Sequence, residues 1–212
     1  MKITMIEGTA KKRKSASSVL LHGLREYLPG VEVAEYALKH AQISREAKEA
    51  ILGADVLILA VPLYVDAIPS HMISVLEELE QNLALLPEKP VVYGVMNCGF
   101  YEGEHCEIAV EMLRHWCAHC GAVFGGSVAV GAGGALTALE KIPMGVGPKS
   151  TLGKTLKTFA QNILKRETAE PVFISLDLTW DEYKQIGETG WRKACRKRGV
   201  PEEALSSPCP AP

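Results

Sequence analysis

The sequence contains no apolar run long enough to cross a bilayer. A transmembrane helix needs ~18 to 20 mostly apolar residues, and the best candidate, 56–65, is shorter and contains Pro62. Charge of one sign is not in excess either. The sequence has 23 Lys and Arg residues and 25 Asp and Glu residues, which gives a formal net charge of −2. Dedicated nucleic-acid binders usually carry a strongly basic balance. We therefore expect neither a membrane nor a nucleic-acid partner.

An export signal and a cysteine framework are also lacking. Residues 1–4 lead directly into a strand-like segment, without the layout of a signal peptide. The six cysteines are irregularly spaced, which predicts reduced thiols and a cytoplasmic location. Cys117 and Cys120 form one CxxC, but this supplies only two of the four ligands that a structural zinc site needs. We expect no metal site.

The sequence does contain a regular alternation of strand and helix patterns. The predicted strands are 2–7, 31–36, 56–61, 91–96 and 122–130, and the predicted helices are 15–28, 44–52, 69–85, 108–120 and 151–164. This order predicts a parallel sheet covered by helices on both faces. A chain of 212 residues fits an open doubly wound sheet better than an eight-stranded barrel of ~250 residues.

The chain divides by composition into three parts. Residues 1–166 hold the alternating elements, and 167–200 form an extension with an amphipathic helix over 181–198. Cations in the last turn of that helix, followed by Gly199, are a typical helix C-terminus. The tail, 201–212, carries four prolines, and we expect it to be disordered.

The first of three candidate ligand loops is 8–18, which follows the first predicted strand. Ligands of open α/β sheets bind beyond the carboxyl ends of the strands. The loop is rich in hydroxyls and cations and leads into a helix N-terminus, where an anion is favoured. The alternative is that Ser15 or Ser17 only caps the helix while the lysines are solvated. Arg13 replaces the second glycine of a P-loop, which argues against a nucleoside triphosphatase.

The other two loops follow the two most buried strand patterns. Loop 62–69 is aromatic and aliphatic and contains two prolines, so it suits the face of a flat ring system, or else it is an ordinary strand–helix connection. Loop 97–103 combines small residues with aromatics, and Gly99 and Gly103 allow close backbone approach. Together the three loops predict a pocket for a mononucleotide with an aromatic ring.

These features resemble the flavodoxin-like NAD(P)H-dependent FMN reductases, which include iron–sulfur flavoproteins and quinone reductases. The resemblance covers about 2–164 and is carried by Gly8-Thr9, Ser15-Ala16-Ser17, Pro62-Leu63-Tyr64, Asn97-Cys98-Gly99 and 131–134. It implies a three-layer α/β/α sandwich whose five-stranded parallel sheet has the order 2-1-3-4-5. Ala16 departs from the family's usual Asn. The cysteine cluster of the iron–sulfur members is lacking, so no iron–sulfur centre is expected.

The resemblance also implies a cofactor and an activity. FMN would be bound through Thr9, Lys11, Ser15, Ala16, Ser17, Pro62, Leu63, Tyr64, Val65, Asn97, Cys98, Gly99 and Tyr101. NAD(P)H would supply a hydride, and a small acceptor such as a quinone would take the electrons. No catalytic side chain is assigned, because hydride transfer is the cofactor's own chemistry. The basic run 12–14 would either meet the 2′-phosphate of NADPH or be solvated.

Two further expectations concern partners and an alternative role. Members of the family often dimerise with the flavin near the interface, so the resemblance implies a homodimer or higher homo-oligomer. The alternative function is a non-enzymatic electron carrier or a flavin-free scaffold on the same fold. Ala16 and the crowded basic loop are the features that favour this alternative.

Overall fold

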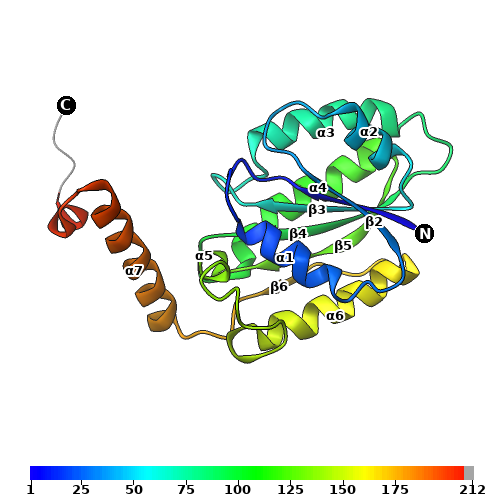
Figure 1. Ribbon diagram of the computed structural model, residues 1–212. Coiled ribbons are helices and arrows are strands. Elements are labelled where there is room, and N and C mark those ends of the chain that lie inside the picture. Colours follow the sequence, from blue (N-terminus) through cyan, green and yellow to red (C-terminus); the bar gives the residue numbers. More distant parts are fainter. Residues whose placement is uncertain (208–212) are drawn as a thin grey trace. The chain divides into compact units, whose positions relative to one another are not determined.

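Six parallel strands form one sheet in the computed structural model, which describes residues 1–207 (Figure 1). Their order is β2-β1-β3-β4-β5-β6, and their bounds are β1 Lys2–Glu7, β2 Glu32–Ala37, β3 Val56–Pro62, β4 Val91–Asn97, β5 Val123–Val130 and β6 Val172–Ile174. The predicted order of the first five strands is confirmed. The predicted number is corrected to six, because Val172 of β6 pairs with Val128 of β5.

Helices cover both faces of this sheet (Figure 1). One layer holds α2, α3 and α4, and the other holds α1, α5 and α6. Their bounds are α1 Ala16–Arg25, α2 Arg45–Leu52, α3 Ser70–Leu83, α4 Glu107–Cys120, α5 Gly133–Leu136 and α6 Ser150–Lys165, with short 3₁₀ turns η1 Gly103–Cys106 and η2 Gly147–Lys149. The molecule is therefore the three-layer α/β/α sandwich that the resemblance implies.

The central strands are the most apolar because helices cover them on both sides. All residues of β3 up to Val61 are buried, and so are the residues of β4 after Val91. Above them, α3 and α4 are joined by a hydrogen bond from the Trp116 indole to the Leu76 carbonyl oxygen, at 2.9 Å. This core fixes the carboxyl ends of the strands at one edge of the sheet.

The strand register brings the ends of four strands together. Glu7 of β1 lies beside Ala60 of β3, and Asn97 of β4 lies between Pro62 of β3 and Val130 of β5. The loops that follow these strands therefore start at the same edge, where ligands of such sheets bind.

The chain forms two compact units, Met1–Asp177 and Leu178–Pro212. The first extends beyond the predicted boundary at 166 because β6 joins the sheet. The second contains α7, Trp180–Arg198, and the 3₁₀ turn η3, Glu202–Ser206. The helix predicted over 181–198 is confirmed.

The tail prediction is corrected for part of its length. We expected disorder over 201–212, but the turn η3 is ordered by hydrogen bonds and ion pairs between Glu202 and the α7 residues Arg192 and Arg196. The end of the tail, 208–212, lies outside the described residues. Within the described part of the chain, no helix is both long and apolar enough to span a membrane.

Candidate active site

Hydrogen bonds tie the three predicted ligand loops to one another. The Leu63 amide donates to the Asn97 carbonyl oxygen at 2.7 Å, which joins the second loop to the third. The Asn97 side-chain amide donates to the Ser17 hydroxyl at 2.9 Å, which joins the third loop to α1. The Thr9 and Tyr64 hydroxyls lie 3.5 Å apart and join the first loop to the second. The residues expected to form one pocket thus meet at one edge of the sheet.

Ser15 caps α1. Its hydroxyl oxygen accepts from the Ser18 amide at 2.9 Å, and its hydrogen is donated to Glu7 Oε1 at 2.6 Å. The Ser18 hydroxyl in turn accepts from the Ser15 amide at 3.0 Å and completes a capping box. The side chain of Ser15 therefore caps the helix, as the alternative interpretation of this loop expected. A phosphate contact would require this hydroxyl to leave Glu7, a residue that the sequence analysis did not single out.

Ser17 is buried in the first turn of α1. Its hydroxyl oxygen already accepts a hydrogen bond from Asn97, so its hydrogen is available for a second partner. Thr9 is buried as well, and its hydroxyl accepts a long hydrogen bond, 3.4 Å, from the Lys11 amide. Ala16, half-buried at the first helical position, offers only its backbone amide. Thr9 and Ser17 are thus the buried hydroxyls of this loop that do not cap the helix.

The basic run of the first loop is exposed. Lys14 forms an ion pair with Glu140, whereas neither Lys11 nor Lys12 has a salt-bridge partner among residues 1–207. The amides of residues 12–14 also make no hydrogen bond to another described residue. This stretch therefore presents backbone donors and side-chain cations beside the start of α1, which is the arrangement that binds phosphate groups.

The second loop is a tight turn. Tyr64 and Ala67 exchange two backbone hydrogen bonds, of 3.0 and 3.2 Å. The residues between them, Val65 and Asp66, both have positive φ, at 51° and 58°. This conformation is costly for a β-branched residue, yet Val65 is 98% exposed and gains no packing in return. Pro62 and Leu63 are half-buried, and Leu63 packs against the hydrophobic core.

The turn after β5 supports the third loop through a backbone hydrogen bond. Asn97 and Cys98 are buried, Tyr101 is half-buried, and Gly99 is exposed. The Gly133 amide donates to the Cys98 carbonyl oxygen at 2.9 Å, and a Cβ on Gly133 would stand 2.8 Å from that oxygen. Only glycine permits this approach. The segment 131–134, one of the carriers of the resemblance, therefore supports the third loop.

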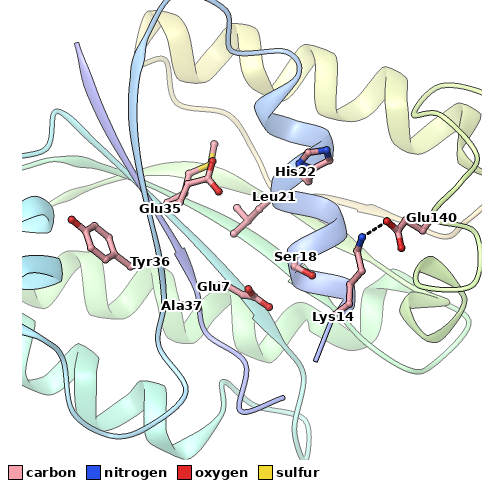
Figure 2. A pocket seen from close by; sticks show the side chains of 10 residues that line it. Glu7, Lys14, Ser18, Leu21, His22, Glu35, Tyr36, Ala37 and Glu140 are labelled. Carbon is pink, nitrogen blue, oxygen red and sulfur yellow. Dashed lines mark hydrogen bonds and ion pairs between the residues drawn. The ribbon is translucent and has the colours of Figure 1, made fainter. Parts of the chain in front are cut away.

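A cavity of about 380 Å³ opens beside the first loop (Figure 2). It lies between α1 and β2 and is lined by polar and apolar side chains in about equal measure; the polar ones include Glu7, Ser18, His22 and the ion pair of Lys14 with Glu140. Glu7 joins this cavity to the site, because its carboxylate also accepts the Ser15 hydroxyl.

Cys117 and Cys120 lie apart from the site, buried on α4. Burial raises the pKa of Cys117 to about 12 and that of Cys120 to about 11. Within residues 1–207, no three His, Cys, Asp or Glu side chains are grouped as metal ligands.

A match to a family model, over most of the unit Met1–Asp177, shows the family of this chain. A family model described as NADPH-dependent FMN reductase matches residues 1–137 of the 212, a region that contains all the loops of the site. The chain belongs to the NADPH-dependent FMN reductase family. Membership makes it a flavin-dependent oxidoreductase, with FMN as cofactor and NAD(P)H as co-substrate.

Solved structures of flavodoxins and azoreductases share the fold. A flavodoxin of Streptococcus pneumoniae TIGR4 is 17% identical with a TM-score of 0.52, over 78% of this chain and 99% of that one. A flavodoxin, WrbA-like protein of Agrobacterium tumefaciens is 12% identical with a TM-score of 0.55, over 78% and 96%. An azoreductase of Bacillus anthracis is 16% identical with a TM-score of 0.50, over 76% and 99%. None of the curated proteins matches the chain.

The residues at the strand ends fit FMN. The buried hydroxyls of Thr9 and Ser17, the loop amides and Lys11 are the donors and the charge that would meet the phosphate of a bound FMN. The half-buried Pro62 and Leu63 and the exposed Gly99 are the residues that would lie along the flat ring. Some of the side chains that the resemblance implied are already engaged within the protein: Ser15 with Glu7 and Ser18, Asn97 with Ser17 and Val61, and Cys98 with the carbonyl oxygens of Phe100 and Glu102.

Proposed function

We propose that this protein passes a hydride from NAD(P)H through FMN to a small acceptor such as a quinone. The observation that carries the proposal is the set of hydrogen bonds linking Thr9 with Tyr64, Leu63 with Asn97, and Asn97 with Ser17. These bonds join the loop proposed for the phosphate to the two loops proposed for the ring. A prearranged pocket is what a flavin enzyme contributes, since the cofactor supplies the hydride chemistry.

In this proposal each loop has its own part. Thr9, Lys11 and Ser17 bind the FMN phosphate, together with the backbone amides of 12–14. The segments 62–65 and 97–101 flank the isoalloxazine ring. Val65 and Phe100, which are 98% and 49% exposed, give the mouth of the site an apolar rim that suits a flat organic acceptor. We further propose a cytoplasmic homo-oligomer, as the family resemblance implies.

NADPH turnover tests the proposal. The FMN-loaded protein should oxidise NADPH in the presence of a water-soluble quinone faster than an equal concentration of free FMN does. A rate no faster than that of free FMN would instead establish the alternative, an electron carrier or scaffold on the same fold.

A matched pair of variants links the turnover to the site. Thr9→Val keeps the shape of the side chain but removes its hydroxyl, so it should weaken FMN binding severalfold. Thr189→Val makes the same change at an exposed position of α7 and should leave FMN binding unchanged. Equal effects of the two substitutions would contradict the assignment of Thr9.

A further inference from the structure

The helix α7 presents an aromatic face that its own unit leaves exposed. Trp180 and Trp191 are 54% and 64% exposed, and no residue of the helix is buried. The two tryptophans are 11 residues apart in the sequence, which is close to three helical turns, so both lie on one face of the helix. Large apolar side chains that are exposed together mark an interaction surface.

Two glycines, Gly187 and Gly190, lie between the tryptophans on the same side of the helix. A glycine in a helix interior costs about 1 kcal/mol relative to alanine. Beyond the helix's own backbone, a Cβ added at either position would meet no atom within 4 Å. Packing within the chain therefore does not require these glycines. A backbone without side chains beside a large ring instead allows a second helix to approach closely.

The charges of α7 are divided between its two halves. Residues 180–190 include three carboxylates and one cation, whereas 191–198 include five cations and no carboxylate. Glu202 pairs with two of these cations, Arg192 and Arg196, and leaves the second half basic. A surface that complements α7 along its whole length is therefore basic beside the first half and acidic beside the second. A second α7 that runs in the opposite direction has this distribution of charge.

We propose that α7 pairs in antiparallel orientation with α7 of a second copy of this chain. The pair sets the acidic half of each helix beside the basic half of the other and opposes their dipoles, whereas a parallel pair would bring the two basic halves together. A two-fold axis level with Thr189 places Trp191 of each copy beside Gly187 of the other. The ring then occupies the gap that the glycine leaves. The same axis places Asp181 level with Lys197 at both ends.

This pairing surface is separate from the region that defines the family, because the family model matches residues 1–137. The paired helices would be about 28 Å long, at 1.5 Å per residue. Contact along one face of each gives an interface at the small end of the specific range, which is typical of weak association. We therefore expect the pair at high protein concentration, and not in the dilute samples in which unfolding is followed.

Zero-length carbodiimide coupling tests the antiparallel pair directly, because the reagent joins a carboxylate to an amine that is in contact with it. Asp181 and Lys197 lie about 24 Å apart along one helix, at 1.5 Å per residue, so a bond between them can form only between two chains. The full chain, half of it isotopically labelled, is coupled at high concentration and low salt. We expect mass spectrometry to find mixed-isotope peptides that join 181–182 to Lys197. Absence of these peptides would overturn the proposal.

A matched pair of variants tests the packing at the centre of the pair. Gly187→Leu introduces a better helix former, so circular dichroism should show equal or higher helix content, yet the crosslink should be lost because leucine fills the gap for Trp191. Thr189→Ala changes a residue on the opposite side of the helix and should retain the crosslink. A crosslink that survives Gly187→Leu at its wild-type yield would overturn the proposed pairing.

A lipid surface is the other occupant that aromatic and basic side chains on one helix would suit. Tryptophan fluorescence of the full chain is therefore followed during addition of vesicles that contain anionic phospholipid. We expect no shift of the emission. A blue shift with these vesicles, in protein that forms no crosslink between 181–182 and Lys197, would assign the face to a lipid surface and overturn the pairing of two chains.

Discussion

The two units of this chain are stabilised in different ways. In Met1–Asp177 the strands β3 and β4 are buried under helices on both sides, and burial of apolar area is the main stabilising contribution. In the second unit, α7 has no buried residue, and its two tryptophans, Trp180 and Trp191, are 54% and 64% exposed. That helix is stabilised at its ends, by the Thr179 capping box and by the pairs with Glu202. The candidate site lies entirely in the unit that has a core.

The largest difference between the units is expected for deletion of apolar side chains. Ile58→Ala removes a fully buried side chain from β3 and should cost about 2–5 kcal/mol of unfolding free energy. Trp191→Ala, at an exposed position of α7, should change it by less than about 0.5 kcal/mol. Urea unfolding followed by circular dichroism measures both. A cost for Trp191→Ala as large as that for Ile58→Ala would show that α7 is packed, and the comparison would be broken.

Loss of the hydrogen bonds that join the loops comes next. Asn97→Ala leaves the Ser17 hydroxyl and the Val61 carbonyl oxygen without their buried amide donor, which should cost about 1–3 kcal/mol. It should also weaken FMN binding, because the first and third loops lose their link. Asn82→Ala is the control, since Asn82 donates only to the Glu78 carbonyl oxygen at an exposed helix surface. Unfolding measurements and FMN titration of both variants compare the two effects. Equal effects of Asn97→Ala and Asn82→Ala would contradict the role of Asn97.

A smaller effect is expected at Tyr93, a buried residue of β4 whose hydroxyl contacts the end of α6. Its hydroxyl donates to the carbonyl oxygens of Asn162 and Glu167, and burial raises its pKa from its usual value near 10 to about 12. Because the folded protein binds this proton more tightly, the contribution to stability is complete below pH ~10 and is lost as the pH rises toward 12. Tyr93→Phe should cost about 1 kcal/mol at neutral pH.

The pH dependence distinguishes this account of Tyr93 from a simple packing effect. Stability curves from pH 8 to 12 should fall less steeply above pH ~10 for Tyr93→Phe than for the wild type. Parallel curves would mean that the hydroxyl does not titrate with folding.

The smallest effect is expected at the end of α7. Arg196→Ala removes an exposed ion pair with Glu202, and exposed pairs contribute little to stability. The arginine lowers the pKa of Glu202, so any contribution is present above the unfolded pKa of a glutamate and is lost on acidification. The urea midpoint should not change measurably, while proteolysis near η3 should become faster. A lowered midpoint would indicate that the second unit stabilises the first.

Some elements of the structure can be predicted from the sequence and others cannot. The run that becomes β3 was recognisable because burial on both faces makes every residue apolar. The strand β6 was assigned to the extension because three residues are too few to show a period, and its pairing with β5 depends on segments distant in the chain. The boundary at 166 was misplaced for the same reason.

Within the site, residue types were predictable and partners were not. The glycines, hydroxyls and aromatics of the three loops predict a mononucleotide pocket because the ends of parallel strands meet at one edge. The bonds from Ser15 to Glu7 and from Asn97 to Ser17 join residues that only the folded backbone brings together. No local pattern carries that information.

Titration of the apo-protein with FMN, followed by quenching of flavin fluorescence, tests the central claim most directly. The account predicts saturable binding of one FMN per chain, weakened by Thr9→Val and by Asn97→Ala and unaffected by Thr189→Val. Absence of saturable binding by the folded wild-type protein would contradict the assignment of the three joined loops as a flavin site.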